Sequence, residues 1–263
     1  MTSSANGTTR TWQTPRGQFL DHLDVQAKAQ QVVEGGIAGT GKKHDSTAVA
    51  RGVVEVLFGE TQDSSGVHVQ TVLATLGALA GFAVQMGIRE ELVKSGKIAI
   101  EKAFVTVTAK DGSLYYFGDL LNEGLVASRQ GQVSVWGLVA GAAQNLGAKG
   151  LPDIRDTFAH VSHTVGGQQF GVPRLPPQLM PRLAPFQLLD KFWNPVRNYL
   201  ATSVSTPMLW PFVLAHAAQL VMQQAAKVIE PALATEVIME AAIPMSRVDP
   251  RQVYAAYFWP TDC

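Results

Sequence analysis

The sequence predicts an α+β fold that is predominantly α-helical, with packed helices around a central apolar helix and a small antiparallel β-hairpin. Two stretches carry this prediction. Residues 67–88 form the longest apolar run of the chain, and residues 104–117 contain two β-branched and aromatic runs joined through Asp111 and Gly112. Elsewhere, apolar residues recur at helical spacing, which favours helices packed around that centre.

The central run is rich in alanine and glycine, and Gly77 and Gly81 have the spacing that allows neighbouring backbones to approach closely. Its length would span a bilayer. Polar residues such as Gln70 and Gln85 interrupt it, however, and its flanks lack a lopsided excess of basic residues. We therefore expect a buried helix of a soluble protein, with a membrane helix as the alternative.

The hairpin is the strongest strand signal, because Asp-Gly suits a tight turn between two such runs. A two-stranded hairpin is only marginally stable by itself in water. We therefore expect a helix layer, further strands or a second copy across a symmetry axis to support it. Residues 132–136 and 168–172 are candidates for extra strands.

Several further segments have helical periodicity and end near glycine or proline. Asp119 is expected to cap the short helix that follows the hairpin. Helices are predicted over 19–34, from Ser46 onward, through 119–125, and over 136–146, 153–165, 210–229 and 232–242.

The domain organisation follows from composition. Residues 1–17 are rich in Ser, Thr and Gly and are expected to be a flexible N-terminal tail, followed by a single helix-rich globular domain over 18–263. Eight of the 14 prolines lie between Pro173 and Pro211. Because proline disrupts helix interiors, we expect an extended Pro-rich strap over about 172–211 without a long helix.

Charge and cysteine content limit the function classes. The 21 basic and 21 acidic residues cancel, which argues against nucleic acid as a partner. Charged residues make up only 16% of the chain and hydrophobic residues 46%, so weak charge repulsion leaves room for self-association and for a protein partner. The single cysteine, Cys263, excludes an intrachain disulfide and suits the reducing cytoplasm.

Residues 36–43 are similar to a phosphate-binding loop. However, Lys43 stands where a hydroxyl should hold magnesium, and a helical segment precedes the glycines where a strand is required. We interpret this segment as a glycine-rich connection between helices. No cofactor is expected from it.

Asp156, His160 and His163 form the sharpest chemical pattern, because their spacing places all three on one face of a helix. Such a face could bind zinc or another divalent transition metal. The same helix carries an apolar stripe that includes Ile154 and Phe158, so the histidines are expected to point towards solvent. A solvated polar face is the favoured interpretation, and a metal site is the alternative.

No motif specifies a reaction. The function favoured by the sequence is a non-catalytic interaction or assembly protein, homo-oligomeric and cytoplasmic, without a cofactor. One alternative is a metal-dependent enzyme that uses Asp156, His160 and His163, and another is a membrane-associated protein anchored by residues 67–88.

Overall fold

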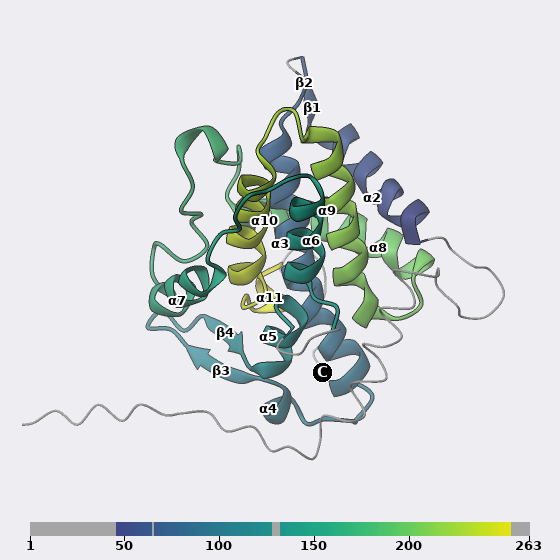
Figure 1. Ribbon diagram of the computed structural model, residues 1–263. Helices are drawn as coiled ribbons and strands as arrows, with labels where there is room; N and C mark the ends of the chain where they lie inside the picture. Colours follow the sequence, from purple (N-terminus) through teal and green to yellow (C-terminus); the bar gives the residue numbers. More distant parts are fainter. Residues whose placement is uncertain (1–45, 65, 128–131, 254–263) are drawn as a thin grey trace, which may run out of the picture.

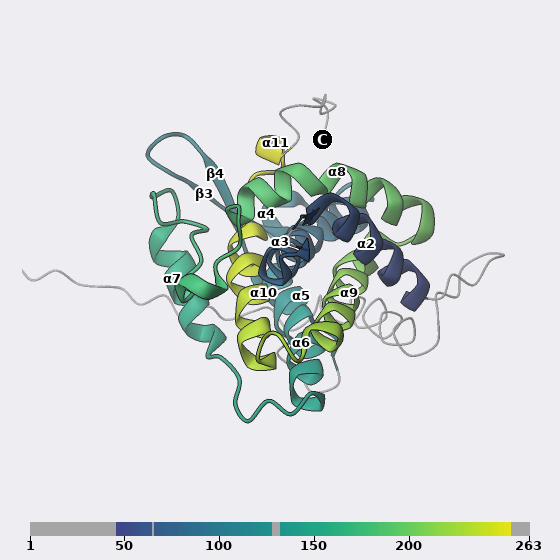
Figure 2. The same cartoon turned by 90° about the horizontal axis from the view of Figure 1, so that it is seen from above.

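The computed structural model describes residues 46–64, 66–127 and 132–253, and it has the predicted α+β, predominantly helical architecture (Figure 1). Helix α3 (Val69–Ile88) lies at the centre and is surrounded by other helices, as the end-on view of Figure 2 shows. The long surrounding helices are α2 (Ser46–Thr61), α6 (Val135–Asn145), α8 (Pro185–Ser203), α9 (Trp210–Ala225) and α10 (Pro231–Met245).

Shorter elements connect these helices. They are β1 (Gln62–Asp63), β2 (Gly66–Val67), the π-helical turn η1 (Arg89–Val93), α4 (Ile100–Ala103), β3 (Val105–Thr108), β4 (Leu114–Phe117), α5 (Asp119–Leu125), α7 (Ile154–Thr164), the 3₁₀ turns η2 (Pro177–Leu179) and η3 (Pro207–Leu209), and α11 (Pro250–Val253).

Helix α3 is apolar on all sides and is therefore buried on all sides, as predicted. Its buried polar side chains have partners within the protein: Gln85, for example, donates from Nε2 to the carbonyl oxygens of Ser246 and Val248, at 2.9 and 3.2 Å. Among the described helices, only the continuous helical stretch formed by α3 and η1 is long and apolar enough to cross a membrane without a bend. Its most apolar part is wholly buried inside the protein. This is the packing expected of a core helix.

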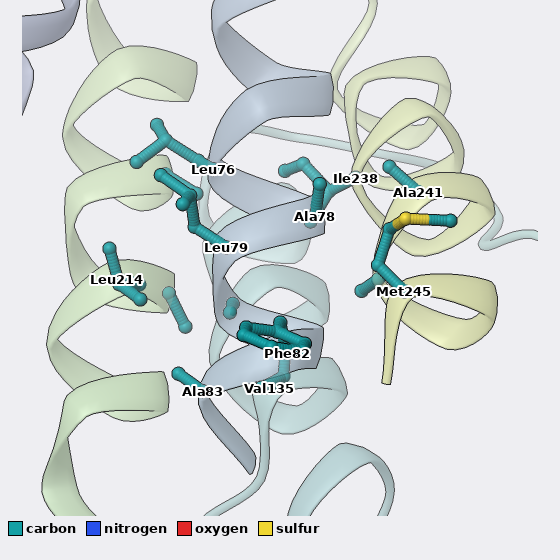
Figure 3. Packing of buried hydrophobic residues seen from close by; sticks show 14 of the residues in the cluster. Leu76, Ala78, Leu79, Phe82, Ala83, Val135, Leu214, Ile238, Ala241 and Met245 are labelled. Carbon is teal, nitrogen blue, oxygen red and sulfur yellow. The ribbon is translucent and has the colours of Figure 1, made fainter. Parts of the chain in front are cut away.

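The side chains around α3 divide between two neighbouring helices (Figure 3). Leu76 and Leu79 point towards α9, where Leu214 lies, whereas Ala78 faces Ile238 of α10. The α10 side of α3 also carries two glycines, so α10 can approach its backbone closely.

The proline-rich region differs from its prediction. Instead of an extended strap over 172–211, it contains α8, a helix of 19 residues. Pro185 stands in the first turn of α8, where its missing N–H costs nothing. Pro195 lies inside, but the helix is held by its buried face, including Trp193, which packs edge-on against Phe82 at 4.7 Å between ring centroids. Within the predicted strap, chain outside helices is confined to residues 172–184, apart from the short turn η2, and to residues 204–206.

The prediction of extra strands at 132–136 and 168–172 was wrong. Residues 168–171 form turns, and Ser134 caps α6, accepting from the N–H of Gly137 at 3.0 Å. Instead, the chain after α10 pairs with β4: Tyr115 bridges to Val248, and the N–H of Tyr116 donates to the carbonyl oxygen of Arg247 at 2.9 Å.

The other predicted helices within the described residues are present, with small differences at their ends. Asp119 is the first residue of α5 rather than its cap, which is Gly118. Pro244 lies in the last turn of α10 and does not end the helix before it. The predicted tail over 1–17, the helix over 19–34 and the loop over 36–43 lie outside the described residues.

Candidate functional site

The β3–β4 hairpin projects from the side of the helical bundle in both views (Figures 1 and 2). Its antiparallel register pairs Val105 with Phe117 and Thr108 with Leu114. The predicted turn is confirmed: Gly112 has φ 85°, a conformation that glycine adopts without strain, and Asp111 accepts from the N–H of Ser113 at 2.9 Å.

The two strands of the hairpin have different surroundings. On β4, Tyr115 and Tyr116 are each only 8% exposed, whereas Val105 on β3 is 46% exposed. Within the described ranges, β4 lies between β3 and the residues after α10, and no strand pairs with the outer side of β3. The outer edge of β3 is therefore the open edge of this small sheet.

The hydrogen bonds of β4 show which main-chain groups lie at that edge. The N–H of Tyr116 points away from β3, because it donates to Arg247. The residue opposite Tyr116 is Thr106, so this pair exchanges no main-chain bonds, and the N–H and C=O of Thr106 point outward. Because orientation alternates along a strand, Thr108 also presents both groups to the open edge.

Strand β4 is fastened to the bundle by Arg89 on one side. The guanidinium carbon of Arg89 lies 4.3 Å from the ring centroid of Tyr116 and 4.8 Å from that of Phe104. Its Nε donates to Oε1 of Gln85 at 3.3 Å. Burial lowers the pKa of Arg89, although Tyr116 and the negative charge of Asp249 act in the opposite direction. The two rings favour the cation by cation–π attraction.

A second arginine, Arg247, holds the end of β4. It is only 2% exposed, and its Nη2 donates to Oδ1 of Asn122 in α5 at 2.7 Å. Its guanidinium carbon lies 5.1 Å from the ring centroid of Phe117 and 5.7 Å from that of Phe158. Burial lowers the pKa of Arg247 to about 10. Within the described residues, Nε and Nη1 make no hydrogen bond.

The segment between α7 and α8 is fastened separately by a cluster of charged residues. Glu240 of α10 is 5% exposed and accepts from Thr157 Oγ1 at 2.9 Å and from Arg174 Nη2 at 3.0 Å. Arg174 also donates to Asp156 at 2.6 Å. The hydrogen bonds of Glu240 are directed to α7 and to the extended chain, which indicates a structural role for this carboxylate.

The three residues of the predicted metal site all lie on α7, but their side chains do not converge on a common point in the way that metal ligands would. Asp156 pairs with Arg174, and Nδ1 of His163 lies 2.7 Å from the carbonyl oxygen of Ala159. His160 does not point fully into solvent as expected, since its Nε2 is buried and has no hydrogen-bond partner among the described side chains. In the described part of the chain, no group of three or more His, Cys, Asp or Glu residues could hold a metal ion. The metal site stays a prediction.

Sequence reasoning located the hairpin but not its open edge. The sequence feature that marks an unprotected strand edge was present in β3, where Val and Thr alternate without a charged residue or proline. For Arg247 no such signal exists, because its aromatic and amide partners come from β4, α5 and α7, which lie far away in the sequence.

Comparisons of this chain with protein-family models, with curated proteins and with solved structures find no match.

Proposed function

We propose that this protein is a non-catalytic interaction protein that self-associates by strand addition at the outer edge of β3. The observation that carries this proposal is the outward orientation of the N–H and C=O groups of Thr106 and Thr108, which have no strand partner among the described residues. Extended main-chain groups of this kind bind a further strand, because both chains then satisfy their donors and acceptors.

The composition of β3 supports the same function. Proteins usually protect open strand edges with lysine, proline or a bulge. Strand β3 consists only of valine and threonine, which favour strands and carry no charge that would repel a second chain. The exposed side chain of Val105 adds apolar surface next to the edge.

The support behind the hairpin reduces the cost of binding. Strand β4 is held by its pairing with residues 247–248 and by the contacts of Arg89 and Arg247 with its aromatic rings. An incoming strand therefore meets an edge that is already extended, and little conformational entropy is lost on the protein side.

A second copy of the chain is the partner that best suits this edge. The formal net charge is zero, so two copies approach without overall repulsion. A two-fold dimer also uses the same surface twice, which is the commonest arrangement of homo-oligomers. One cysteine in the whole chain suits assembly in the reducing cytoplasm.

The Thr106→Pro variant tests this function. Proline at position 106 removes an outward N–H without removing a bond to β4, so the hairpin should persist while the edge is blocked. We expect sedimentation over a concentration series to show a dimer for the parent and at least about a tenfold weaker dimer for Thr106→Pro.

Thr106→Val is the matched control, because it keeps the outward N–H and the preference for strands. It should dimerise like the parent. A parent protein that stays monomeric at all concentrations, or a Thr106→Pro variant that dimerises as well as Thr106→Val, would exclude assembly through this edge.

A further inference from the structure

We infer that the strand added to β3 is β3 of a second copy, antiparallel to the first, with Val107 on the two-fold axis. This inference rests on the proposed function, since it specifies the geometry of the strand addition. It follows from the orientation of the main-chain groups along β3 and from the bonds that already occupy both ends of the strand.

Only outward-facing residues can exchange main-chain hydrogen bonds across the new interface. On β3 these residues are Thr106 and Thr108. In a symmetric dimer, Thr106 can therefore pair with itself, Thr108 can pair with itself, or Thr106 can pair with Thr108 of the partner subunit. These pairings define three registers, each shifted from the next by two residues along the partner strand.

The first two registers each lose bonds at an end of the strand. If Thr106 paired with itself, the neighbouring pair would need Phe104, the next outward-facing residue towards the N-terminus. The N–H of Phe104 is not free for this pair, because it already donates to the carbonyl oxygen of Ile100 at 2.9 Å. If Thr108 paired with itself, Thr106 would lie opposite Lys110, which belongs to the turn that Gly112 closes. Each register therefore keeps a single complete pair.

The third register uses both outward residues fully. Thr106 pairs with Thr108 of the partner subunit, and the symmetry repeats the pair, so two reciprocally bonded pairs form. Val107 then faces its own copy across the axis, and the exposed Val105 lies opposite Ala109, which shields part of its apolar surface. No charged side chain lies within the paired strands.

Such an interface is small and belongs to the transient class of protein contacts. Its geometry can be captured covalently, because residues facing each other in a non-hydrogen-bonded antiparallel pair have Cα atoms about 4.5 Å apart. That separation lies within the range of a disulfide. The native thiol is removed for this purpose by Cys263→Ser.

The test is mild oxidation of Val107→Cys in the Cys263→Ser background, followed by non-reducing electrophoresis. We expect a covalent dimer. Val105→Cys in the same background is the matched control: in this register its two thiols lie four residues apart along the strands, about 13 Å, which is too far for a disulfide. Cross-linking of Val105→Cys should be at least about tenfold slower.

A second measurement covers the case in which Val107→Cys does not fold. It uses positions 106 and 108, where a cysteine should be tolerated because Thr106 and Thr108 are both exposed. Thr106→Cys and Thr108→Cys, each with Cys263→Ser, are oxidised separately and as a mixture. The mixture should give a cross-linked heterodimer, whereas each variant alone should give little product.

The outcomes separate the register from the function. Equal cross-linking of Val105→Cys and Val107→Cys, or cross-linking of Thr106→Cys with itself, would overturn the register. If Thr106→Pro abolishes the parent dimer but the mixture does not cross-link, strand addition stands and this register is wrong. If the parent does not dimerise at all, both proposals fail.

Discussion

Gly81 of α3 lies against the carbonyl oxygen of Ala242 in α10, so closely that a Cβ atom at position 81 would overlap that oxygen. Gly77 has the same relationship with the carbonyl oxygen of Ile238, about one turn earlier. The two helices therefore touch backbone to backbone, and the glycine spacing that membrane helices use for close packing serves a buried core contact here.

Gly81→Ala should be strongly destabilising. The atom it meets belongs to the main chain of a buried helix and cannot rotate away, so α3 and α10 must separate. We expect a loss of about 3 kcal/mol or more in the free energy of unfolding, measured with urea. Gly141→Ala in α6 is the control: in the described part of the chain, no atom beyond its chain neighbours and its own helix backbone lies within 4 Å of the added Cβ, and alanine should stabilise the helix by about 0.5–1 kcal/mol. A loss below about 1 kcal/mol at position 81 would contradict this packing.

Replacing Arg247 separates the destabilisation that comes from burying its charge from the stabilisation that comes from the packing of its side chain. Folding lowers the pKa of Arg247, so the folded protein holds this proton less tightly than the unfolded chain does. The charge therefore lowers the free energy of unfolding, and this destabilisation is present at every pH below the folded pKa of about 10. Arg247→Met keeps much of the packing against Phe117 and Phe158 without the charge.

We expect Arg247→Met at neutral pH to be as stable as the parent or more stable by up to about 3 kcal/mol. Arg247→Ala should lose about 3 kcal/mol, because it leaves a cavity. Urea unfolding of the parent and of both variants measures these two differences in the free energy of unfolding. If methionine were as damaging as alanine, the guanidinium itself would be stabilising β4 through the rings and Asn122.

Glu236 predicts a pH dependence of stability. Burial raises the pKa of Glu236, and the neighbouring Glu240 raises it further, while Arg174 lowers it. The folded state therefore binds this proton more tightly than the unfolded chain, and stability increases as pH falls from the folded pKa towards the ordinary value of 4.5.

Glu236→Gln should remove this dependence. The variant should be more stable than the parent at pH 7, by less than about 1 kcal/mol because the side chain is partly solvated. The difference should disappear at acidic pH, where the parent carboxyl is protonated in both states. Urea unfolding across this pH range is the measurement, and a variant less stable than the parent at pH 7 would contradict the sign.

Arg174 is expected to fasten residues 165–184 to the bundle. Arg174→Met removes donors to Glu240 and Asp156 and leaves the buried Glu240 carboxylate with fewer partners. We expect a loss of about 2 kcal/mol and faster hydrogen exchange in residues 165–184, with protection of α3 unchanged. Arg155→Met, an exposed position on α7, is the comparison and should change neither quantity. Equal exchange in both variants would show that other contacts hold this segment.

Local patterns were sufficient where local forces decide the structure. The continuous apolar run predicted a buried α3, and the Asp111–Gly112 turn predicted the hairpin, because a turn residue acts through its own backbone. The proline count failed for α8, since it treated every proline as a helix breaker. Pro185 begins that helix, and buried contacts such as that of Trp193 with Phe82 compensate for Pro195.

The sequence by itself determined the helical class, the apolar centre and the position of the hairpin, because hydrophobic periodicity and turn chemistry act over a few residues. Tertiary structure alone decided that Val248 pairs with Tyr115, that Arg247 lies among aromatic rings, and that the outer side of β3 has no strand partner among the described residues. These contacts join residues far apart in the chain, and the order of strands in a sheet depends on where the whole bundle places them.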